Sequence, residues 1–370
     1  MKKKVLHIIH GFSIGGAEKI VLKYLYDFRN DPDIDIYALT LSPSSNSIFD
    51  RKISYDNLNV IYGNIKFVGP NSSIWAKLHI NLKAIKMIHE TLKQIKPDIV
   101  HTHLAIQHLS LLPTLLRRVK KKYHTIHSIP GSNPKRRFKY IDKIAFKYCH
   151  VVPVCLTNHM IKLTKQYYNI SHCELVRNGI DTGIFKKYYN TSAIRKELGI
   201  SSKSFVVGHV GRLCKTKNQK FIIDVFAKIK DKIPDATLLL IGEGEDKAEI
   251  VKKVRSLSLG SSVRLLGARA DIPKLLSIMD VFIFPSLYEG LGMALIEAQA
   301  AGKKCFVSDT VPEEAIVTEN ICKLSLSLTP QQWCNAILNN EFPYEKNRLS
   351  LKDYDKTNTN YVLKKMYLGH

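Results

Sequence analysis

The sequence is poor in cysteine and has no long apolar run, and both shortages narrow the class of protein. Its 370 residues include seven cysteines, which are scattered and form no Cys-x-x-Cys pair. This dispersed, odd set argues against a disulfide framework or a zinc site and fits a reducing cytosol. No apolar run approaches the ~18–20 residues of a membrane-spanning helix. The N-terminal segment has some features of a signal peptide, but His7 and His10 interrupt its apolar core, which predicts a first strand instead.

Acidic residues are also in short supply. Against 56 Lys and Arg there are 32 Asp and Glu, so the formal net charge is +24. Residues 1–180 hold 28 of the basic and 11 of the acidic side chains, and the basic excess gathers at 117–122 and 135–139. Nucleic acid and anionic membranes both attract such patches. Because no nucleic-acid-binding motif accompanies the charge, an anionic membrane surface is favoured and nucleic acid is not expected. Solvated helix ends without any partner are the alternative.

Strand-like and helix-like segments alternate through both halves of the chain. A length of 370 residues suggests two domains. The alternation predicts the α/β class, with two parallel sheets that bind ligands at the carboxyl ends of their strands. A turn at Asn178-Gly179 predicts the crossing from a first domain, 1–180, to a second domain, 181–345. The cleft between two such domains is the expected site.

The stretch 280–302, DVFIFPSLYEGLGMALIEAQAAG, combines a strand, a glycine-bearing loop and a helix. Its apolar run at 281–284 predicts a buried strand, and the segment after the glycines predicts a helix. The helix dipole and the N–H groups at the helix start favour an anion, and the glycines let a phosphate approach. Glu289 and Glu297 frame this site, and a carboxylate can accept hydrogen bonds from vicinal hydroxyls. The stretch therefore predicts a site for a phosphate and a polyol.

Two further loops have the same character. Arg212 and Lys217 lie in a loop after the predicted strand 205–209 and before a helix. Such a cation pair can neutralise a diphosphate whose charge grows as an attached group leaves. Gly15 and Gly16 lie between a first strand and a helix, although Gly-x-Gly-x-x-Gly is absent. A plain tight turn is an equally good interpretation of Gly15-Gly16, and a surface basic loop is the alternative for the other segment.

Three histidines follow two adjacent predicted strands. They are His101, His103 and His127. His-x-His could be a metal pair, but the sequence reveals no third ligand, and core or capping histidines are the alternative. We therefore expect no metal. Two Asp-x-Asp patterns, which can also mark metal sites, are attributed to chance spacing and lie at 33–35 and 353–355.

The two glutamates belong to a longer pattern. Glu-x7-Glu within FPSLYEGLGMALIEAQAAG resembles the retaining glycosyltransferases of family four, which have the GT-B fold. HTIHS around His127 and Asn-Gly-Ile-Asp ending at Asp181 resemble phrases of the same family. The resemblance covers essentially the whole chain and implies two Rossmann-like domains facing across a cleft, with a C-terminal helix in 346–370 that returns to the first domain. SDTVPEE from Ser308 and a later Gln-Gln-Trp-Cys resemble the capsule and exopolysaccharide branch.

The resemblance also implies roles for residues of both domains. Arg212, Lys217 and the N–H groups of 290–293 would hold the diphosphate and stabilise it as leaving group. Glu297 would bind ribose hydroxyls, and Glu289 would bind hydroxyls of the transferred sugar. The implied catalytic residues are Glu289, His127, Arg212 and Lys217. The implied donor-binding residues are Gly15, Gly16, Arg212, Lys217, Gly267, Glu289, Gly290, Leu291, Gly292, Met293 and Glu297, without a metal or a cofactor.

These features predict a retaining, metal-independent glycosyltransferase. It would move a sugar from a nucleotide-diphosphate sugar, a UDP-sugar on the resemblance, to a polyprenyl-diphosphate-linked saccharide in capsule, exopolysaccharide or O-antigen assembly. The basic first domain predicts a cytoplasmic protein that is peripheral at the anionic inner face of the membrane. One alternative is an epimerase or hydrolase of GT-B shape, which would convert the donor without an acceptor. The other is a non-catalytic, basic surface-binding protein.

Overall fold

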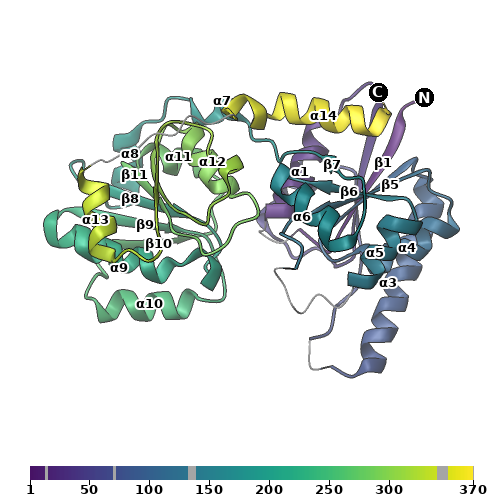
Figure 1. Ribbon diagram of the computed structural model, residues 1–370, viewed down its shortest axis with the longest axis horizontal. Helices are drawn as coiled ribbons and strands as arrows, with labels where there is room; N and C mark the ends of the chain where they lie inside the picture. The colour runs from purple at the N-terminus through teal and green to yellow at the C-terminus, as the bar shows by residue number, and fades with distance from the viewer. Residues whose placement is uncertain (13–15, 70–71, 132–138, 340–348, 370) are drawn as a thin grey trace. The chain divides into compact units, whose positions relative to one another are not determined.

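The computed structural model divides the chain into two compact units. It describes residues 1–12, 16–69, 72–131, 139–339 and 349–369. One unit comprises Met1–Gly179 together with Thr357–His370, and the other comprises Ile180–Lys356. The last segment of the first unit contains all but the first residue of the C-terminal helix α14 (Lys356–Leu368), drawn in yellow in Figure 1. The first unit is therefore discontinuous in sequence, whereas the second is one continuous segment.

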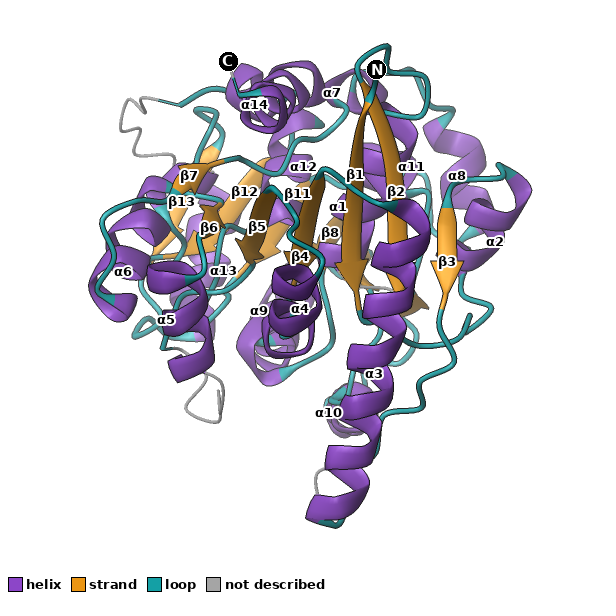
Figure 2. Ribbon diagram, turned by 90° about the vertical axis from the view of Figure 1, so that its right-hand side faces the viewer, coloured by secondary structure: helices purple, strands orange, loops and turns teal. Residues whose placement is uncertain are grey.

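A seven-stranded parallel sheet forms the centre of the first unit. Its strand order is β3-β2-β1-β4-β5-β6-β7. The direction of winding reverses between β1 and β4, which lie side by side in Figure 2. Such a switch point is where parallel α/β sheets bind ligands, outside the carboxyl ends of the strands. The strands are β1 (Lys3–Ile9), β2 (Ile34–Thr40), β3 (Val60–Tyr62), β4 (Ile99–His103), β5 (Lys121–Ile126), β6 (Val151–Cys155) and β7 (Glu174–Leu175).

Helices cover both faces of this sheet because its central strands are apolar on both sides. Val5 and Ile9 of β1 lie in a core with α1, α2 and α14, whereas Leu6 and Ile8 lie in a core with α3 and α4. This period of two places His7 on the α14 face. The helices are α1 (Gly16–Asp27), α2 (Ile48–Tyr55), α3 (Ile74–Ile95), α4 (Gln107–Leu116), α5 (Lys139–Tyr148) and α6 (Asn158–Tyr168).

Helix α14 returns to the first unit, as the sequence predicts. Leu363 and Tyr367 are buried in the core of that unit. The ammonium of Lys364 lies 2.8 Å from a carboxylate oxygen of Asp31 and 2.7 Å from one of Asp33. Apolar packing and ion pairs together make the helix an integral part of the first unit.

The second unit contains a six-stranded parallel sheet of order β10-β9-β8-β11-β12-β13. Its winding reverses between β8 and β11, and Phe226 and Trp333 are fully buried in its core. The strands are β8 (Phe205–Val210), β9 (Ala236–Ile241), β10 (Val263–Gly267), β11 (Val281–Phe284), β12 (Lys304–Ser308) and β13 (Ile321–Leu324). The helices are α7 (Thr182–Phe185), α8 (Thr191–Glu197), α9 (Gln219–Lys232), α10 (Lys247–Ser256), α11 (Ile272–Ser277), α12 (Met293–Ala300) and α13 (Pro330–Asn339), with short 3-10 turns η1 (Lys215–Lys217), η2 (Glu313–Ala315) and η3 (Leu351–Tyr354).

The α/β class is confirmed, but one local prediction is wrong. The strand expected to end before His-Thr-His continues through His103, and Leu104 ends it with a left-handed φ of 60°. The polar segment 42–73 contains α2 besides the short strand β3. Ser47 and Asp50 start that helix with a capping box, in which each side chain bonds a backbone N–H of the other residue.

Candidate active site

The second unit places Arg212 and Lys217 in the loop between β8 and α9, at the switch point of its sheet. Lys217 ends the turn η1, and Asn218 joins it to α9 with a left-handed φ of 58°. The Gln219 side-chain amide donates a hydrogen bond of 2.8 Å to the carbonyl of Arg212 and lies 3.2 Å from Nε2 of His209. A buried side-chain pair from β8 and α9 therefore supports the backbone of this loop.

His209 acts as a neutral support for the same loop. Its Nδ1 lies 2.9 Å from the carbonyl oxygen of Ile283 on the neighbouring strand β11. Because a carbonyl only accepts, Nδ1 carries the proton, and Nε2 accepts from the amide of Gln219. Burial lowers the pKa of His209 to about 4, so the ring stays neutral at neutral pH. Sequence reasoning missed His209 and Gln219, since neither belongs to a recognisable motif.

The loop 285–292 and helix α12 form the strand, loop and helix arrangement that the sequence predicts. Gly292 precedes the helix with a left-handed φ of 86°, and Met293 is the first of its eight residues. The first N–H groups of a helix lack intrahelical acceptors and lie at the positive end of its dipole. Glu289 in the loop and Glu297 in the helix are both buried, at 7% and 4% exposed. The start of this helix can therefore bind an anion, and the carboxylates of Glu289 and Glu297 lie close to it in sequence.

Lys217 and Glu289 come together from two different loops. Their side chains form an ion pair, and the Lys217 ammonium lies 5.1 Å from the centre of the Phe284 ring. The backbone N–H of Leu287 also donates to the carbonyl of Thr216 at 2.8 Å, which ties the two loops together. The Lys217 side chain keeps 21% of its surface exposed. The structure thus orients one predicted cation against one predicted carboxylate and leaves the cation accessible.

Arg212 takes a different partner. Its Nε lies 3.0 Å from a carboxylate oxygen of Glu245, and the two side chains are 71% and 58% exposed. Exposed pairs of this kind contribute only about 0–1 kcal/mol. The guanidinium can therefore exchange Glu245 for an incoming anion at little cost.

Two glycines of the neighbouring loops are fixed by backbone geometry. Gly242 follows β9 with a φ of 140°, and a Cβ there would lie 2.0 Å from the carbonyl oxygen of Gly211. The loop after β9 therefore packs directly on the backbone of the Arg212 loop. Gly267 ends β10 with a φ of 67°, and a Cβ there would lie 2.9 Å from the carboxylate of Glu243.

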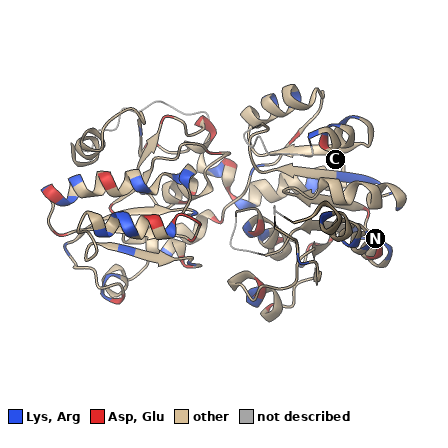
Figure 3. Cartoon of the chain, turned by 90° about the horizontal axis from the view of Figure 1, so that it is seen from below, with Lys and Arg blue, Asp and Glu red and all other residues tan. Residues whose placement is uncertain are grey.

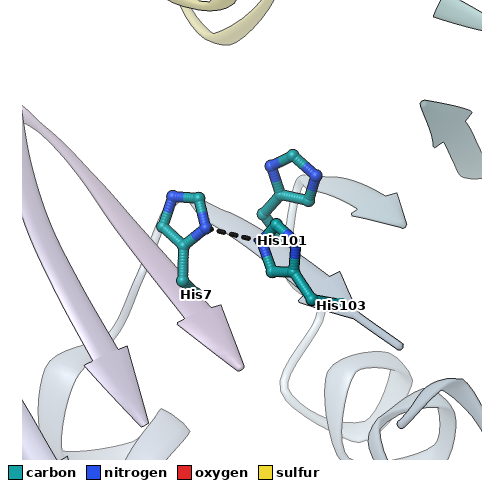
Figure 4. Close-up of side chains that lie close together, drawn as sticks. All are labelled: His7, His101 and His103. Atoms are coloured by element: carbon teal, nitrogen blue, oxygen red, sulfur yellow. Dashed lines mark hydrogen bonds between the residues drawn. The ribbon is translucent and has the colours of Figure 1, made fainter. Parts of the chain in front are cut away.

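In the first unit, hydrogen bonds connect three histidines from three strand ends. Nε2 of His127, just after β5, lies 3.1 Å from Nδ1 of His103 on β4. Nε2 of His103 lies 2.9 Å from Nδ1 of His7 on β1, and Figure 4 shows this contact as a dashed line. His7 and His103 have nearly parallel ring planes, 20° apart. The histidine chosen from the HTIHS pattern is therefore connected to the buried interior of the sheet.

The connection continues through helix α14. The Tyr367 hydroxyl lies 3.3 Å from Nε2 of His7 and 2.6 Å from Nδ1 of His101. Nε2 of His101 lies 2.7 Å from the hydroxyl of Thr125 on β5. We call the continuous series His127, His103, His7, Tyr367, His101 and Thr125 the histidine chain.

A metal ion at these histidines would have to displace existing hydrogen bonds. Ring nitrogens of His7, His101 and His103 lie within 4.8 Å of one another, so His7 supplies the third imidazole that the sequence did not reveal. However, all six nitrogens of these rings already have a hydrogen-bond partner. Burial lowers the pKa of His7 to about 3 and those of His101 and His103 well below the usual value. The arrangement is a hydrogen-bonded series of neutral imidazoles.

The sequence can indicate that His7 lies beside His101 and His103, but only once the order of the strands in the sheet is known. Ile99 lies in the α14-side core, so His101 and His103 lie on that face of β4 by alternation. His7 lies on the same face of β1 and is the register partner of His101. Without knowing that β1 neighbours β4, no spacing rule links residues so far apart.

The remaining predicted residues are placed less informatively. Gly16 is the exposed first residue of α1, whereas Gly15 and the basic residues 135–137 lie outside the described residues. Gly290 is partly exposed and Leu291 is buried before the start of α12. The two Asp-x-Asp patterns have structural partners instead of a common site, with Asp33 paired to Lys364 and Asp355 accepting from Thr182.

Comparison with known proteins identifies the family. The model described as Glycosyltransferase Family 4 matches residues 14–183, and the one described as Glycosyl transferases group 1 matches residues 190–337. The UDP-Gal:alpha-D-GlcNAc-diphosphoundecaprenol alpha-1,3-galactosyltransferase of Escherichia coli is 31% identical over 62% of this chain and 62% of its own length. The capsular polysaccharide biosynthesis glycosyltransferase CapH of Staphylococcus aureus is 24% identical over 99% of both chains.

A solved structure extends the likeness to the fold. The crystal structure of Anabaena HepE in complex with UDP and glucose matches 100% of both chains with a TM-score of 0.77 at 18% identity. The two family models together span most of the chain, and their order follows its two units. The chain therefore belongs to the family 4 glycosyltransferases and has the GT-B fold.

Proposed function

We propose that this protein transfers a sugar, with retention, from a UDP-sugar to a polyprenyl-diphosphate-linked saccharide in the assembly of a capsule, exopolysaccharide or O-antigen. The observation that carries the donor part is the oriented Lys217 and Glu289 pair in the same loop system as the start of α12. The name of the Escherichia coli relative contains UDP-Gal and a diphosphoundecaprenol acceptor, and HepE was crystallised with UDP. Both support UDP as the nucleotide carrier.

The charges of the second unit suit a diphosphate. Glu289 already balances Lys217, so a bound diphosphate needs further positive groups. Arg212 can leave its exposed partner Glu245, and the first amides of α12 add the positive end of a helix dipole. These groups would bind the diphosphate more strongly as it gains charge on leaving the sugar.

The proposed reaction uses the leaving group as the base. The bond between the sugar's anomeric carbon and the phosphate oxygen breaks, and the acceptor oxygen bonds to the same face of that carbon. The acceptor proton passes to the departing phosphate oxygen. Glu289 would hold hydroxyls of the transferred sugar, Glu297 would hold the ribose, and His127 would contact the donor from the first unit.

Thermal unfolding with UDP or GDP tests the donor site. UDP at ~100 times its dissociation constant should add ~2.7 kcal/mol of stability to the parent. Glu297→Ala should lose this shift, whereas Lys220→Ala should keep it because Lys220 pairs with the exposed Glu249. A shift with GDP alone would redirect the donor to GDP-sugars. The absence of a shift with either nucleotide would contradict the donor-site assignment.

Product analysis separates transfer from the alternative reaction. A transferase needs an acceptor, so incubation with the UDP-sugar alone should leave most of the donor unchanged. Rapid conversion of donor alone into an epimer or free sugar would favour a nucleotide-sugar epimerase or hydrolase instead.

The first half of helix α3 supports the lipid part of the proposal. Ile74, Leu78 and Leu82 recur every four residues and are 81%, 46% and 55% exposed, and Trp75 beside them is 79% exposed. Helix α3 extends beyond the sheet in Figure 2, and it carries the exposed Lys83 and Lys86. An apolar stripe beside basic residues suits the surface of an anionic membrane. Among the described helices, none is long and apolar enough to cross a membrane.

Charge alone is a weaker guide to the membrane surface than this apolar stripe. Lys and Arg lie on helices and loops of both units, as Figure 3 shows, and are not confined to one block. We therefore assign membrane contact to the combination of apolar and basic residues on α3.

Sedimentation with vesicles tests this assignment. The parent should sediment with anionic vesicles at low salt and less at high salt, because salt screens the basic residues. The double substitution Ile74→Ser and Trp75→Ser should weaken binding by about tenfold or more, since each side chain would lose its apolar contact. Tyr188→Ser, which alters an exposed aromatic of the second unit, is the control. Equal binding to neutral vesicles would remove the anionic-membrane proposal.

A further inference from the structure

The histidine chain ends at one nitrogen that is not fully buried, Nδ1 of His127, which we call its outward nitrogen. Within the described part of the protein, Nδ1 of His127 has no hydrogen-bond partner, whereas both nitrogens of each other imidazole in the chain are used. His127 is half-buried, and His7, His101 and His103 are at most 1% exposed. A buried series of hydrogen bonds thus leads to one accessible nitrogen at the carboxyl end of β5.

Burial keeps every member of the histidine chain uncharged at neutral pH. It lowers the pKa of His7 to about 3 and that of His127 to about 4, and it also lowers the pKa values of His101 and His103. Burial raises the pKa of Tyr367 well above its usual value, so the hydroxyl keeps its proton. A neutral imidazole has one N–H and one accepting nitrogen. Because the Tyr367 hydroxyl also has one proton, the direction of one hydrogen bond sets the direction of all the others when every donor in the series is used.

The distances at Tyr367 select one of the two directions. O–H donors form hydrogen bonds of about 2.5–3.0 Å. The Tyr367 hydroxyl lies 2.6 Å from Nδ1 of His101 but 3.3 Å from Nε2 of His7. Tyr367 therefore donates to His101, and its oxygen accepts the longer bond from the N–H of His7.

The rest of the chain follows from this choice. His101 accepts at Nδ1, so its Nε2 carries the proton and donates to Thr125. His7 donates from Nε2, so its Nδ1 accepts from Nε2 of His103. Nδ1 of His103 in turn accepts from Nε2 of His127. The outward nitrogen of His127 is left with a lone pair.

We propose that the histidine chain fixes the tautomer of His127 with its proton on Nε2, so that Nδ1 accepts a hydrogen bond from a sugar hydroxyl. A lone pair attracts a hydroxyl proton and repels a phosphate oxygen, so His127 would contact the sugar part of the donor. Only this contact rests on the proposed function, because the tautomer is a property of the first unit alone. Tyr367, His7 and His103 act as positioning residues.

Removing one hydroxyl should reverse the direction of the hydrogen bonds between the imidazoles of the histidine chain. In Tyr367→Phe, the N–H on Nε2 of His7 would be a buried donor without an acceptor, which is costly. Moving the protons of His7, His103 and His127 to Nδ1 relieves this cost. The outward nitrogen of His127 should therefore change from an acceptor to a donor, although it lies two imidazoles away from Tyr367.

Nitrogen-15 spectra of the histidine rings in the full chain measure this change. The His127 signals are identified by their absence in His127→Gln. The parent should show the proton on Nε2 of His127, and Tyr367→Phe should show it on Nδ1. Tyr123→Phe is the matched control, because Tyr123 is also buried against Tyr367 but donates to the carbonyl of Met366, outside the chain. Its His127 spectrum should equal that of the parent.

A second variant reaches the chain from its other end. Thr125→Val keeps the shape of a β-branched side chain but removes the acceptor of His101. It should reverse all the bonds and give the same His127 spectrum as Tyr367→Phe, which keeps the test valid if Tyr367→Phe does not fold. A parent protonated at Nδ1, or an unchanged tautomer in the folded variant, would overturn the proposal.

Transfer kinetics separate this inference from the proposed function. Tyr367→Phe should lower kcat by about ten- to a hundredfold, by analogy with the loss of partners that orient metal-binding histidines. Its UDP-induced thermal shift should stay unchanged, because the nucleotide is assigned to the second unit. A reversed tautomer with unchanged kcat would support the proposed role of the histidine chain in fixing the tautomer, and it would contradict the contact between His127 and the donor. An unchanged tautomer would overturn the proposal that the histidine chain fixes the tautomer of His127, whatever the kinetics show.

Discussion

The switch points of the two sheets carry opposite kinds of chemistry. In the first unit, β1, β4 and β5 lead to imidazoles that are buried, neutral and joined by hydrogen bonds. In the second unit, β8 and β11 lead to Lys217 and Glu289, which are paired charges. The difference follows from depth and partners. A charge at the depth of His7 would lose its hydration without gaining a counter-ion, whereas Lys217 and Glu289 balance each other near solvent.

This comparison teaches that similar parallel sheets do not dictate the electrostatics of their ligand sites. The second unit suits an anion, because its cations can be released from weak or accessible pairs. The first unit suits an uncharged hydroxyl, because its accessible group is one end of a neutral chain. The two halves of the proposed donor, diphosphate and sugar, differ in the same way.

Acid should produce the largest difference in stability between the two units. His7, His101 and His103 stay neutral in the folded unit, with pKa values far below the usual 6.5. Below pH ~6.5 the unfolded chain therefore binds more protons than the folded one, and the stability of the first unit falls as the pH falls. The loss approaches about 1.4 kcal/mol per pH unit for each of these histidines, and above pH ~6.5 their contribution is complete.

Amide hydrogen exchange at pH 7 and pH 5, corrected for the intrinsic rate, checks this prediction. Protection of β1 and β4 should fall more than protection of β8 and β11, because His209 is the single histidine in residues 180–356. Equal losses in both units would show that the buried imidazoles do not set the acid sensitivity.

Loss of a predicted diphosphate-binding cation should have the next largest effect. Lys217→Ala should cost on the order of 3 kcal/mol of transition-state stabilisation, a fall of more than a hundredfold in turnover. Lys220→Ala is the matched control. Lys220 lies shortly after Lys217, at the start of α9, and pairs with the exposed Glu249 of α10. Sugar transfer measured with saturating acceptor gives both values. A similar activity for the two variants would place the diphosphate elsewhere.

The smallest expected effect concerns the exposed partner of Arg212. Glu245→Gln should change the free energy of unfolding by less than about 1 kcal/mol, since exposed ion pairs contribute little. It should slightly raise UDP affinity at low salt by releasing Arg212, and the gain should vanish at high salt. Titration calorimetry at two salt concentrations tests this. A marked loss of affinity would mean that Glu245 holds Arg212 in its binding position.

Local patterns predicted the second unit well. The strand, glycine loop and helix within 280–302 could be read directly, because each signal lies within a few residues of the next. The family and the GT-B fold followed from the same stretch, and both are confirmed. The roles of Glu289 and Glu297 stay predictions, since the structure shows their burial but no bound donor.

Long-range contacts account for what the sequence did not reveal. His7 meets His103 only because β1 lies beside β4, and Tyr367 joins them from the far end of the chain. Arg212 could be chosen as a cation, but its pairing with Glu245 depends on how the loop after β9 folds back. Neither contact leaves a spacing that can be recognised in one sequence.

The place of α14 has a consequence for protein synthesis. The second unit is continuous, so all of its segments are synthesised before residues 357–368 of α14. The first unit is begun earlier but must wait, because Leu363 and Tyr367 complete its core after the whole of 180–356 has been translated. The order of translation and the order of completion are thus reversed. A chain truncated after residue 356 should therefore form a complete second unit and a first unit whose core beside α1 and α2 lacks Leu363 and Tyr367.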